Sequence, residues 1–388
     1  MNVRLRDIPG ITVTYGVVNS GTYTPGGIPM LQAKNIVGGR LLPDTDMYIR
    51  KDTGELNHRT LLREGDLAVV LVGRVGAAAM VTAKHAGWAA ARVVGIIRCE
   101  SPSAQTEGLV EWLWYWFTAP SMHEWFDAEA NSLAQRTLSV QSLADLPVPL
   151  PSVVERRRFL DRFAFIEKRA SASLDLARTA LETANALFFR LREDAAVTPM
   201  TLGDVCEARA AAGHRDRGTS PDGPRQSEAG QSGVKVSTAN VLNAEFPYRY
   251  GRGPGAPEPV WTLPSHLLIA TKKESAGIVL DVAGDAVPAR GTLAVRTQDV
   301  TDQWWLLHEL RSRPADLVSA ALGASARELS AKKFGRLPVS WPTMAVRSEF
   351  GEVASALHER AFLALEDHQD STALLGLLIE RAAAEISQ

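Results

Sequence analysis

The stretch Ala134-Gln135-Arg136-Thr137-Leu138-Ser139, followed by Leu146-Pro147-Val148 and Pro151, has a second version later in the same chain. That version is Ser325-Ala326-Arg327-Glu328-Leu329-Ser330 with Leu337-Pro338-Val339 and Pro342, at a constant offset of 191 positions. Upstream the match continues with small shifts, for example between Leu5-Arg6-Asp7-Ile8 and Leu202-Gly203-Asp204-Val205. A repeat of this length indicates two copies of one structural unit.

Each copy begins with a mixed stretch of short strands and short helices. In the first copy, residues 66–72 and 93–97 are rich in β-branched residues and predict buried strands. The aromatic run Trp112-Leu113-Trp114-Tyr115-Trp116-Phe117 has large apolar residues four positions apart, which is typical of a helix packed on a core. Stacking of splayed nucleic-acid bases on these rings is the alternative interpretation, and we favour the core.

A long helix is predicted to follow each mixed stretch. Residues 153–194 and 344–386 contain neither proline nor glycine apart from Gly351 and Gly376. An apolar stripe with alternating spacings of three and four runs along both helices and keeps the offset of 191, which predicts antiparallel pairing. Its members are Phe163, Ile166, Ala170, Ser173, Ala177, Ala180, Ala184, Leu187 and Leu191 in the first helix, and Ala354, Leu357, Ala361, Ala364, His368, Ser371, Leu375, Leu378 and Ala382 in the second.

The expected architecture is therefore α+β, with two tandem domains of mixed strands and short helices separated by two long antiparallel coiled-coil helices in a pseudo-twofold arrangement. The predicted ranges are 1–151 for the first domain, 152–195 for the central helix, 196–343 for the second domain and 344–388 for the C-terminal helix. A helix of about 42 residues spans about 60 Å, so two domains mounted on such a pair would hold two binding surfaces apart. On DNA, this spacing predicts recognition of two half-sites separated by unread bases.

Composition restricts the class of protein. No apolar run is long enough to cross a membrane and no signal-peptide pattern is present, so we expect a cytoplasmic protein without a membrane partner. The two cysteines cannot form a disulfide framework, and no metal-ligand spacing accompanies them. The net charge of −2 argues at first against nucleic acid, but residues 344–388 alone hold eight acidic and three basic residues. The rest of the chain is slightly basic.

Motifs for catalysis are missing from the sequence. There is no Asn-Pro-Pro-Tyr-like methyltransferase motif, no phosphate-binding GxxxxGK[ST] and no GxSxG nucleophile turn. We therefore expect a non-catalytic protein that carries no cofactor or metal of its own.

The order of motifs resembles the specificity subunits of type I restriction-modification systems. The resemblance rests on the segments 27–36, Glu64-Gly65-Asp66-Leu67, Gly73-Arg74-Val75-Gly76 and Leu146-Pro147-Val148-Pro149-Leu150-Pro151, and on the duplicated layout over nearly the full length. The second copy departs from the pattern, since Ser265-His266 stands for Gly65-Asp66 and the Gly-x-x-Gly turn is replaced near Lys272.

The resemblance implies a subunit that reads a bipartite double-stranded DNA target in a phage-defence complex. It implies two methyltransferase subunits and restriction or translocase subunits as partners, with S-adenosylmethionine, ATP and magnesium held by those partners. Two alternatives remain: a DNA reader of another phage-defence complex, and a structural adaptor that binds no DNA.

Candidate DNA contacts are side chains whose donors match base edges or phosphates and which lie on predicted loops. For Lys34 and Arg74 the alternative is a solvated surface charge, and for Arg136 and Arg327 it is a structural salt bridge where the domain meets the helix. The candidates are Lys34, Asn35, Arg74, Gln135, Arg136, Lys272, Lys273, Arg327, Lys332 and Lys333.

Charged residues of the long helices are candidates for partner binding. The run Arg156-Arg157-Arg158 could touch the DNA backbone, although basic residues also open ordinary solvated helices. Acidic residues of the second helix would repel DNA, so this helix is expected to face a protein partner or water. The candidates are Arg157, Arg158, Glu359 and Glu366.

Overall fold

The computed structural model describes residues 2–18, 24–50, 60–100, 103, 106–130, 136–210, 234–236, 266–271, 279–282, 286–288, 291–299, 301–322 and 328–387. Contacts divide the chain into unit 1, Met1–Ala172 with Asp367–Gln388, and unit 2, Ser173–Glu366. Both boundaries fall inside the long helices, whereas the ranges expected from sequence end the domains at 151 and 343, where these helices begin. Each unit therefore holds a globular head and a part of each helix.

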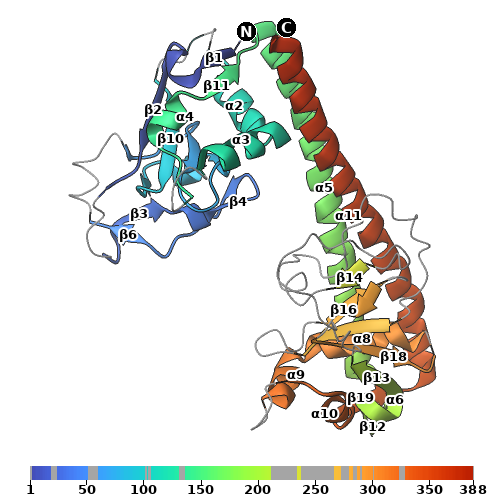
Figure 1. Cartoon of the computed structure of the whole chain (residues 1–388). Helices are drawn as coiled ribbons and strands as arrows, with labels where there is room; N and C mark the ends of the chain where they lie inside the picture. Colours follow the sequence, from blue (N-terminus) through green and yellow to red (C-terminus); the bar gives the residue numbers. More distant parts are fainter. Residues whose placement is uncertain are drawn as a thin grey trace, which may run out of the picture. The chain divides into compact units, whose positions relative to one another are not determined.

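The head of unit 1 is built on a four-stranded antiparallel sheet (Figure 1). Its strand order is β2-β10-β7-β8, with β2 at Ile11–Tyr15, β10 at Val94–Cys99, β7 at Leu67–Val70 and β8 at Ala78–Met80. All four residues of β7 are buried, and alternate side chains enter different cores. Both faces of the sheet are thus covered, which explains the continuous apolar run in the sequence.

Smaller elements complete the head of unit 1. β1 pairs with β11, β4 pairs with β5, and β3 pairs antiparallel with β6 and parallel with β9. These elements, in chain order, are β1 Asn2–Arg4, η1 Leu5–Asp7, β3 Ile28–Leu31, η2 Ala33–Asn35, β4 Ile36–Val37, β5 Arg40–Leu41, β6 Tyr48–Ile49, η4 Ala83–His85, β9 Ala89–Ala90, α2 Leu109–Phe117, α3 Pro120–Ala130, α4 Val140–Ala144 and β11 Pro147–Pro149.

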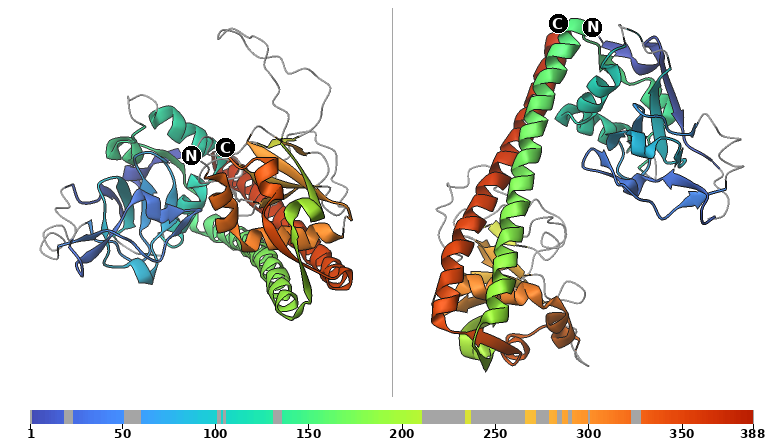
Figure 2. Two further views of the ribbon diagram at one scale, coloured as in Figure 1. Left: turned by 90° about the horizontal axis from the view of Figure 1, so that it is seen from below. Right: turned by 180° about the vertical axis from the view of Figure 1, so that it is seen from behind.

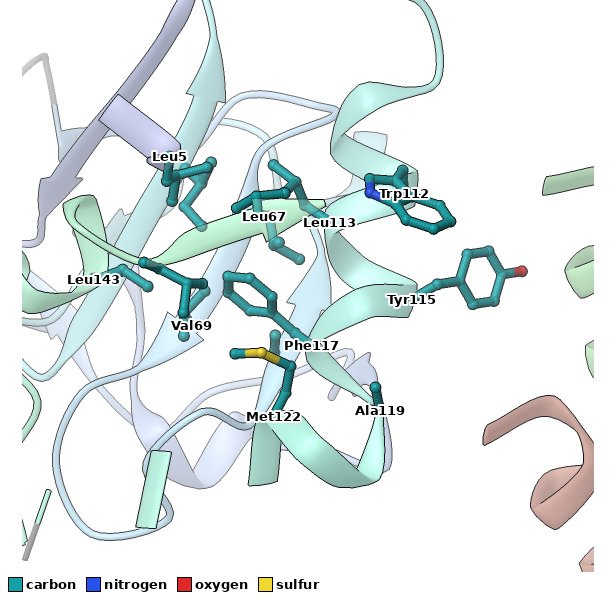
Figure 3. Close-up of a cluster of buried hydrophobic side chains, with 14 of the residues drawn as sticks. Leu5, Leu67, Val69, Trp112, Leu113, Tyr115, Phe117, Ala119, Met122 and Leu143 are labelled. Carbon is teal, nitrogen blue, oxygen red and sulfur yellow. The ribbon is translucent and has the colours of Figure 1, made fainter. Parts of the chain in front are cut away.

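The aromatic helix α2 lies between the sheet and the long helices (Figure 3). Leu113 and Phe117 point toward Leu67 and Val69 of β7, while Trp112 and Tyr115 lie on the other side of the helix. Trp112 is fully buried, and its ring lies 5.9 Å from Phe159 and 6.2 Å from Phe163 between centroids. The core interpretation of this aromatic run is confirmed.

Unit 2 repeats this architecture among the elements that the structure describes. Its antiparallel sheet has the order β13-β18-β15-β16, β12 pairs with β19, and β14 pairs parallel with β17. The elements are β12 Val197–Thr201, α6 Leu202–Val205, β13 Cys206–Ala210, β14 Val234–Val236, β15 His266–Ala270, β16 Val279–Val282, β17 Ala286–Pro288, β18 Thr292–Thr297, α8 Asp302–Ser312, α9 Pro314–Ala321, α10 Ala331–Gly335 and β19 Pro338–Pro342.

Equivalent backbone hydrogen bonds recur in the two heads. The Leu5 N–H donates to the Leu146 carbonyl at 2.9 Å, and the Leu202 N–H donates to the Leu337 carbonyl at the same distance. Ser139 caps α4 by accepting from the Ser142 N–H, as Ser330 caps α10 by accepting from the Lys333 N–H. The predicted duplication of one α+β fold is confirmed.

The long helices are α5, Val153–Asp194, and α11, Met344–Ser387, as the sequence predicted. In unit 1 the first half of α5 packs with the last part of α11, and Phe163 and Ala382 share one core. In unit 2 the second half of α5 packs with the first part of α11 through Ala177, Ala180, Ala361 and Ala364. The helices are therefore antiparallel in both units, and Figure 2 shows them side by side in each.

Every residue of the predicted stripe is buried or half-buried in these pairs, which confirms the heptad register. None of the helices within the described residues has both the length and the apolar character of a membrane-crossing segment.

Candidate nucleic-acid interface

The tight turn between β7 and β8 positions the best-placed candidate, Arg74. Gly73 and Gly76 flank the turn with φ angles of +86° and +85°, a region that favours glycine. A Cβ atom on Gly76 would also lie 2.2 Å from the ring of Phe126. The Gly73 N–H donates to the Arg136 carbonyl at 3.1 Å, so the turn is fixed to the segment that contains the second candidate arginine.

Arg74 joins this turn to the loop that carries Lys34. Its Nη2 group donates to the carbonyls of Ala33 at 3.1 Å and Ile36 at 2.8 Å. The side chain is exposed, and its Nε and Nη1 groups make no hydrogen bond to the described part of the chain. A guanidinium has five N–H donors, so Arg74 can hold the loop and still offer donors to a ligand. We call η2, the turn 73–76 and Arg136 the unit 1 loop cluster.

Lys34 and Asn35 are neighbours in η2 but have different surroundings. Lys34 is 58% exposed, and its Nζ lies 2.6 Å from a carboxylate oxygen of Asp46. The Lys34 ammonium lowers the pKa of the Asp46 carboxyl by this hydrogen bond. An exposed pair of this kind is weak, so the ammonium could exchange Asp46 for a phosphate.

Asn35 is buried, and both ends of its side-chain amide are engaged. Oδ1 accepts from the Gln32 N–H at 3.0 Å, and Nδ2 donates to the Asp44 carbonyl at 3.1 Å. Asn35 is a candidate DNA contact from sequence, but its amide is buried and holds its own loop together. The residue pattern could not show this, since Asp44 approaches from outside the helical turn.

Arg136 forms an exposed ion pair with Asp127 of α3. Asp127 belongs to the head, so this ion pair lies within the head and not where the head meets a long helix. The structure brings Lys34, Arg74 and Arg136 into one cluster, and each of Lys34 and Arg136 has an acidic partner there.

In unit 2, Lys332 and Lys333 lie on the short helix α10. Lys332 is exposed, whereas Lys333 is half-buried and its Nζ donates to the Glu328 carbonyl at 3.4 Å. The remaining candidates lie outside the described residues: Gln135, Lys272, Lys273 and Arg327.

The candidate residues of the long helices lie in different environments. Arg157 pairs with both carboxylate oxygens of Glu107, at 2.9 and 3.0 Å, so it ties α5 to the head of unit 1. Arg158 is exposed, with its guanidinium carbon 5.7 Å from the centre of the Phe159 ring. On α11, Glu359 is exposed and Glu366 is half-buried.

Two arginines at the helix starts have a structural role that the sequence did not reveal. Arg156 is buried and donates from Nε to the Glu107 carbonyl at 2.8 Å, so a contact of this side chain with the DNA backbone is wrong. Arg347, at the offset of 191, donates from Nε and Nη2 to the Asp302 carboxylate at 2.6 and 3.0 Å. The constant offset was the signal that could have identified both as anchors between head and helix.

Within the described residues, no group of three or more histidine, cysteine, aspartate or glutamate side chains could hold a metal ion. Of the two free cysteines Cys206 is buried; its thiol donates to the Leu202 carbonyl at 3.1 Å, and burial raises its pKa to about 12. This thiol is a weak nucleophile.

Comparisons with known proteins give a consistent set of relatives. No protein-family model matches the chain. Over 188 residues the chain is 28% identical to the type I restriction enzyme EcoBI specificity subunit of Escherichia coli, which covers 45% of this chain and 38% of that protein. The chain therefore spans well under half the length of this curated relative.

A solved structure extends the likeness in fold to nearly the whole chain. The type I restriction-modification S subunit from M. genitalium superposes with a TM-score of 0.56 at 13% identity, covering 98% of this chain and 95% of that chain. The HsdS subunit from Thermoanaerobacter tengcongensis is similar at a TM-score of 0.34 and 14% identity, covering 97% of each chain. The first of these likenesses shows a shared fold.

Proposed function

We propose that the chain is a DNA-recognition subunit of the type I restriction-modification kind, in which each unit reads one half of a two-part target. The sequence likeness to the Escherichia coli specificity subunit and the shared fold support this function. The observation that carries it is the duplication of one head, with the same strand order and equivalent hydrogen bonds in both units. Two equivalent heads in one chain suit two half-sites.

In this function the chain has no catalytic role of its own. It would bind double-stranded DNA and dock two methyltransferase subunits, with restriction subunits joining the complete complex. S-adenosylmethionine, ATP and magnesium would be held by those partners. The exposed apolar side chains Leu374 and Leu377 of α11, 46% and 67% exposed, suit a protein partner better than water.

A selection from random duplex DNA tests the function. The full chain, together with its methyltransferase partner, is expected to retain DNA with two short specific segments separated by a gap of fixed length. A single continuous consensus would contradict the two-head account. Retention of no DNA would instead support a structural adaptor.

Within unit 1, Arg74 is the proposed DNA contact with the best geometry. Because its Nη2 group already holds two carbonyls, a contact would use the Nε and Nη1 donors. If these donors read a base edge, Arg74→Gln costs about 1–3 kcal/mol of discrimination at one position of one half-site. If they contact phosphate, affinity falls evenly for all sequences and the salt dependence becomes shallower.

The matched control for Arg74 is Arg63→Gln. Arg63 is 55% exposed and pairs with Glu100 at 2.8 Å in the same unit, but it lies outside the unit 1 loop cluster. This change is expected to leave both half-sites unaltered. Equal losses in the two variants would remove Arg74 from the interface.

A further inference from the structure

A groove between α5 and α11 in unit 1 combines a basic rim with an apolar floor. It has a volume of about 190 Å³, and Arg158, Arg162 and Arg381 line it together with Phe159, Phe163 and Leu378. This is smaller than the roughly 300–1,000 Å³ of typical small-molecule sites, so it suits one or two inserted side chains better than a cofactor.

The rim of the groove carries an excess of positive charge. Arg381 is 76% exposed and forms an ion pair at 3.0 Å with Glu385. Glu385 also lines the groove. Arg158 and Arg162 are exposed and form no ion pair with the described residues. Three guanidinium groups and one carboxylate leave a net charge of +2 around the cavity.

Exposed apolar side chains extend this surface along α5. Arg158, Arg162 and Phe165 follow one another at spacings of four and three, so they lie on one face of the helix. Phe165 is 72% exposed, and Val154, one turn before Arg158 on the same face, is 81% exposed. Exposed arginine and aromatic side chains beside a buried apolar floor are the residue types that contribute most to protein–protein binding.

The equivalent surface of unit 2 lacks both features. At the offset of 191, Arg158 and Arg162 correspond to Glu349 and Val353, while Arg381 and Glu385 correspond to Arg190 and Asp194. One arginine and two acidic residues give a net charge of −1 there. Phe165 and Val154 correspond to the exposed alanines Ala356 and Ala345. Two surfaces that the fold makes equivalent thus differ in charge and in apolar contact area.

We propose that the groove of Arg158, Arg162 and Arg381 in unit 1 binds an acidic polypeptide segment that inserts an apolar side chain between flanking carboxylates. Carboxylates would pair with the arginines of the rim, and the apolar side chain would pack on the lining residues Phe159 and Phe163. A DNA backbone fits less well, because it offers no apolar group to Phe165 or Val154. The proposal does not require unit 1 to read DNA.

Binding of a synthetic peptide to the full chain tests this inference. The probe is a fluorescent peptide in which glutamates flank one central phenylalanine, and the control peptide has glutamine at every glutamate position. We expect one glutamate peptide to bind per chain, and added salt to weaken this binding. The glutamine peptide is expected to bind at least about tenfold more weakly than the glutamate peptide. Equal binding of the two peptides would overturn the proposal.

Variants based on unit 2 locate the site. The double change Arg158→Glu and Arg162→Val introduces the residues of the equivalent surface and is expected to weaken peptide binding about tenfold or more. Because both side chains are exposed, the thermal unfolding of the variant should match that of the original chain. Unchanged peptide binding in this variant would contradict the proposed site, whether or not the variant loses duplex DNA binding.

The reverse exchange gives an independent test. Glu349→Arg, Val353→Arg and Ala356→Phe together place the basic and aromatic features on unit 2, and all three positions are exposed. This variant is expected to bind two glutamate peptides per chain. A stoichiometry that stays at one would show that these residue types do not define the site.

Discussion

At the scale of single residues, a buried ion pair distinguishes the head of unit 1. The Arg98 Nε and Nη2 groups donate to the two carboxylate oxygens of Asp66 at 2.8 and 2.6 Å, and both side chains are at most 5% exposed. The Asp66 carboxylate raises the pKa of Arg98 through these hydrogen bonds. Asp66 also accepts from the Arg63 N–H at 2.7 Å, so the pair fixes the start of β7.

Removal of Asp66 is expected to leave the buried Arg98 charge with weaker ionic compensation, from the Glu100 carboxylate at 3.9 Å. Asp66→Ala should lower the free energy of unfolding by about 3–5 kcal/mol. The exposed pair Arg63–Glu100 is the control, since Arg63→Ala should cost at most about 1 kcal/mol. Chemical denaturation measures the free energy of unfolding of both variants. Similar losses would show that the buried pair of Asp66 and Arg98 stabilises the head no more than an exposed pair does.

This pair also shows how far sequence could reach at the residue scale. The sequence shows the segment Gly65-Asp66 and two matching arginines of the repeat, Arg98 and Arg296. Nothing in their spacing indicates that Asp66 contacts Arg98, which is 32 positions away. In unit 2 His266 stands at the position of Asp66, and the counterpart of Arg98, Arg296, is exposed instead of buried. The ion-pair partners of the candidate contacts Lys34 and Arg136 could not be predicted for the same reason. These partners, Asp46 and Asp127, come from a separate loop and a separate helix.

At the scale of elements, the helix pair conserves volume between the two units by exchanging large and small side chains. Phe163 and Ala382 share the core of unit 1, while their counterparts Ala354 and Leu191 pack in unit 2. The heptad spacing predicted the stripe correctly because it depends only on helical periodicity. It could not predict Phe188 and Ile379, which lie beside the stripe and are buried by the heads.

Transfer of the unit 2 pair into unit 1 tests this compensation. Phe163→Ala alone should lower the free energy of unfolding by about 3–5 kcal/mol, because it leaves a cavity beside Trp112. Adding Ala382→Leu should restore part of the loss, since Phe163 and Ala382 line the same groove. Phe165→Ala, at an exposed position, should change stability by no more than about 0.5 kcal/mol. Strictly additive effects of the two core changes would contradict the account.

The contacts between heads and helices differ in their response to pH. In unit 1 the Tyr115 hydroxyl donates to Glu167 at 2.7 Å, and at the equivalent place in unit 2 the Nε2 atoms of His308 and His358 lie 3.0 Å apart. Burial lowers the pKa of His308 to about 3 and that of His358 well below its ordinary value, and Arg311 lowers both further. Glu309 lies next to His308 in α8, ion-paired with Arg192 and Arg313.

The folded state therefore favours neutral histidines, whereas the unfolded chain binds protons below about pH 6.5. Stability from this pair is present above that pH and is lost as pH falls toward 3, by up to about 1.4 kcal/mol per pH unit for each histidine. The variant His308→Tyr with His358→Glu introduces the unit 1 pair and should flatten the decline between about pH 6.5 and 4.5. Thermal unfolding across this range provides the measurement, and an unchanged slope would contradict the assignment.

At the scale of the whole molecule, the duplication was the most predictable feature. The constant offset predicted two copies of one head, the stretches poor in glycine and proline predicted the bounds of α5 and α11, and the shared apolar stripe predicted their antiparallel pairing. Details that break the repeat, such as the basic groove of unit 1, needed coordinates because α5 and α11 contribute to it from positions far apart in the sequence. In the proposed function, each head reads its own half of the DNA target.

Exchange of one head measures this modularity most directly. Residues 1–150 are replaced by the corresponding head of a related subunit, and the DNA target of the complex is mapped by sequencing methylated or selected DNA. One half of the target is expected to change while the other half is retained. A change in both halves, or in neither, would contradict the assignment of one half-site to each unit.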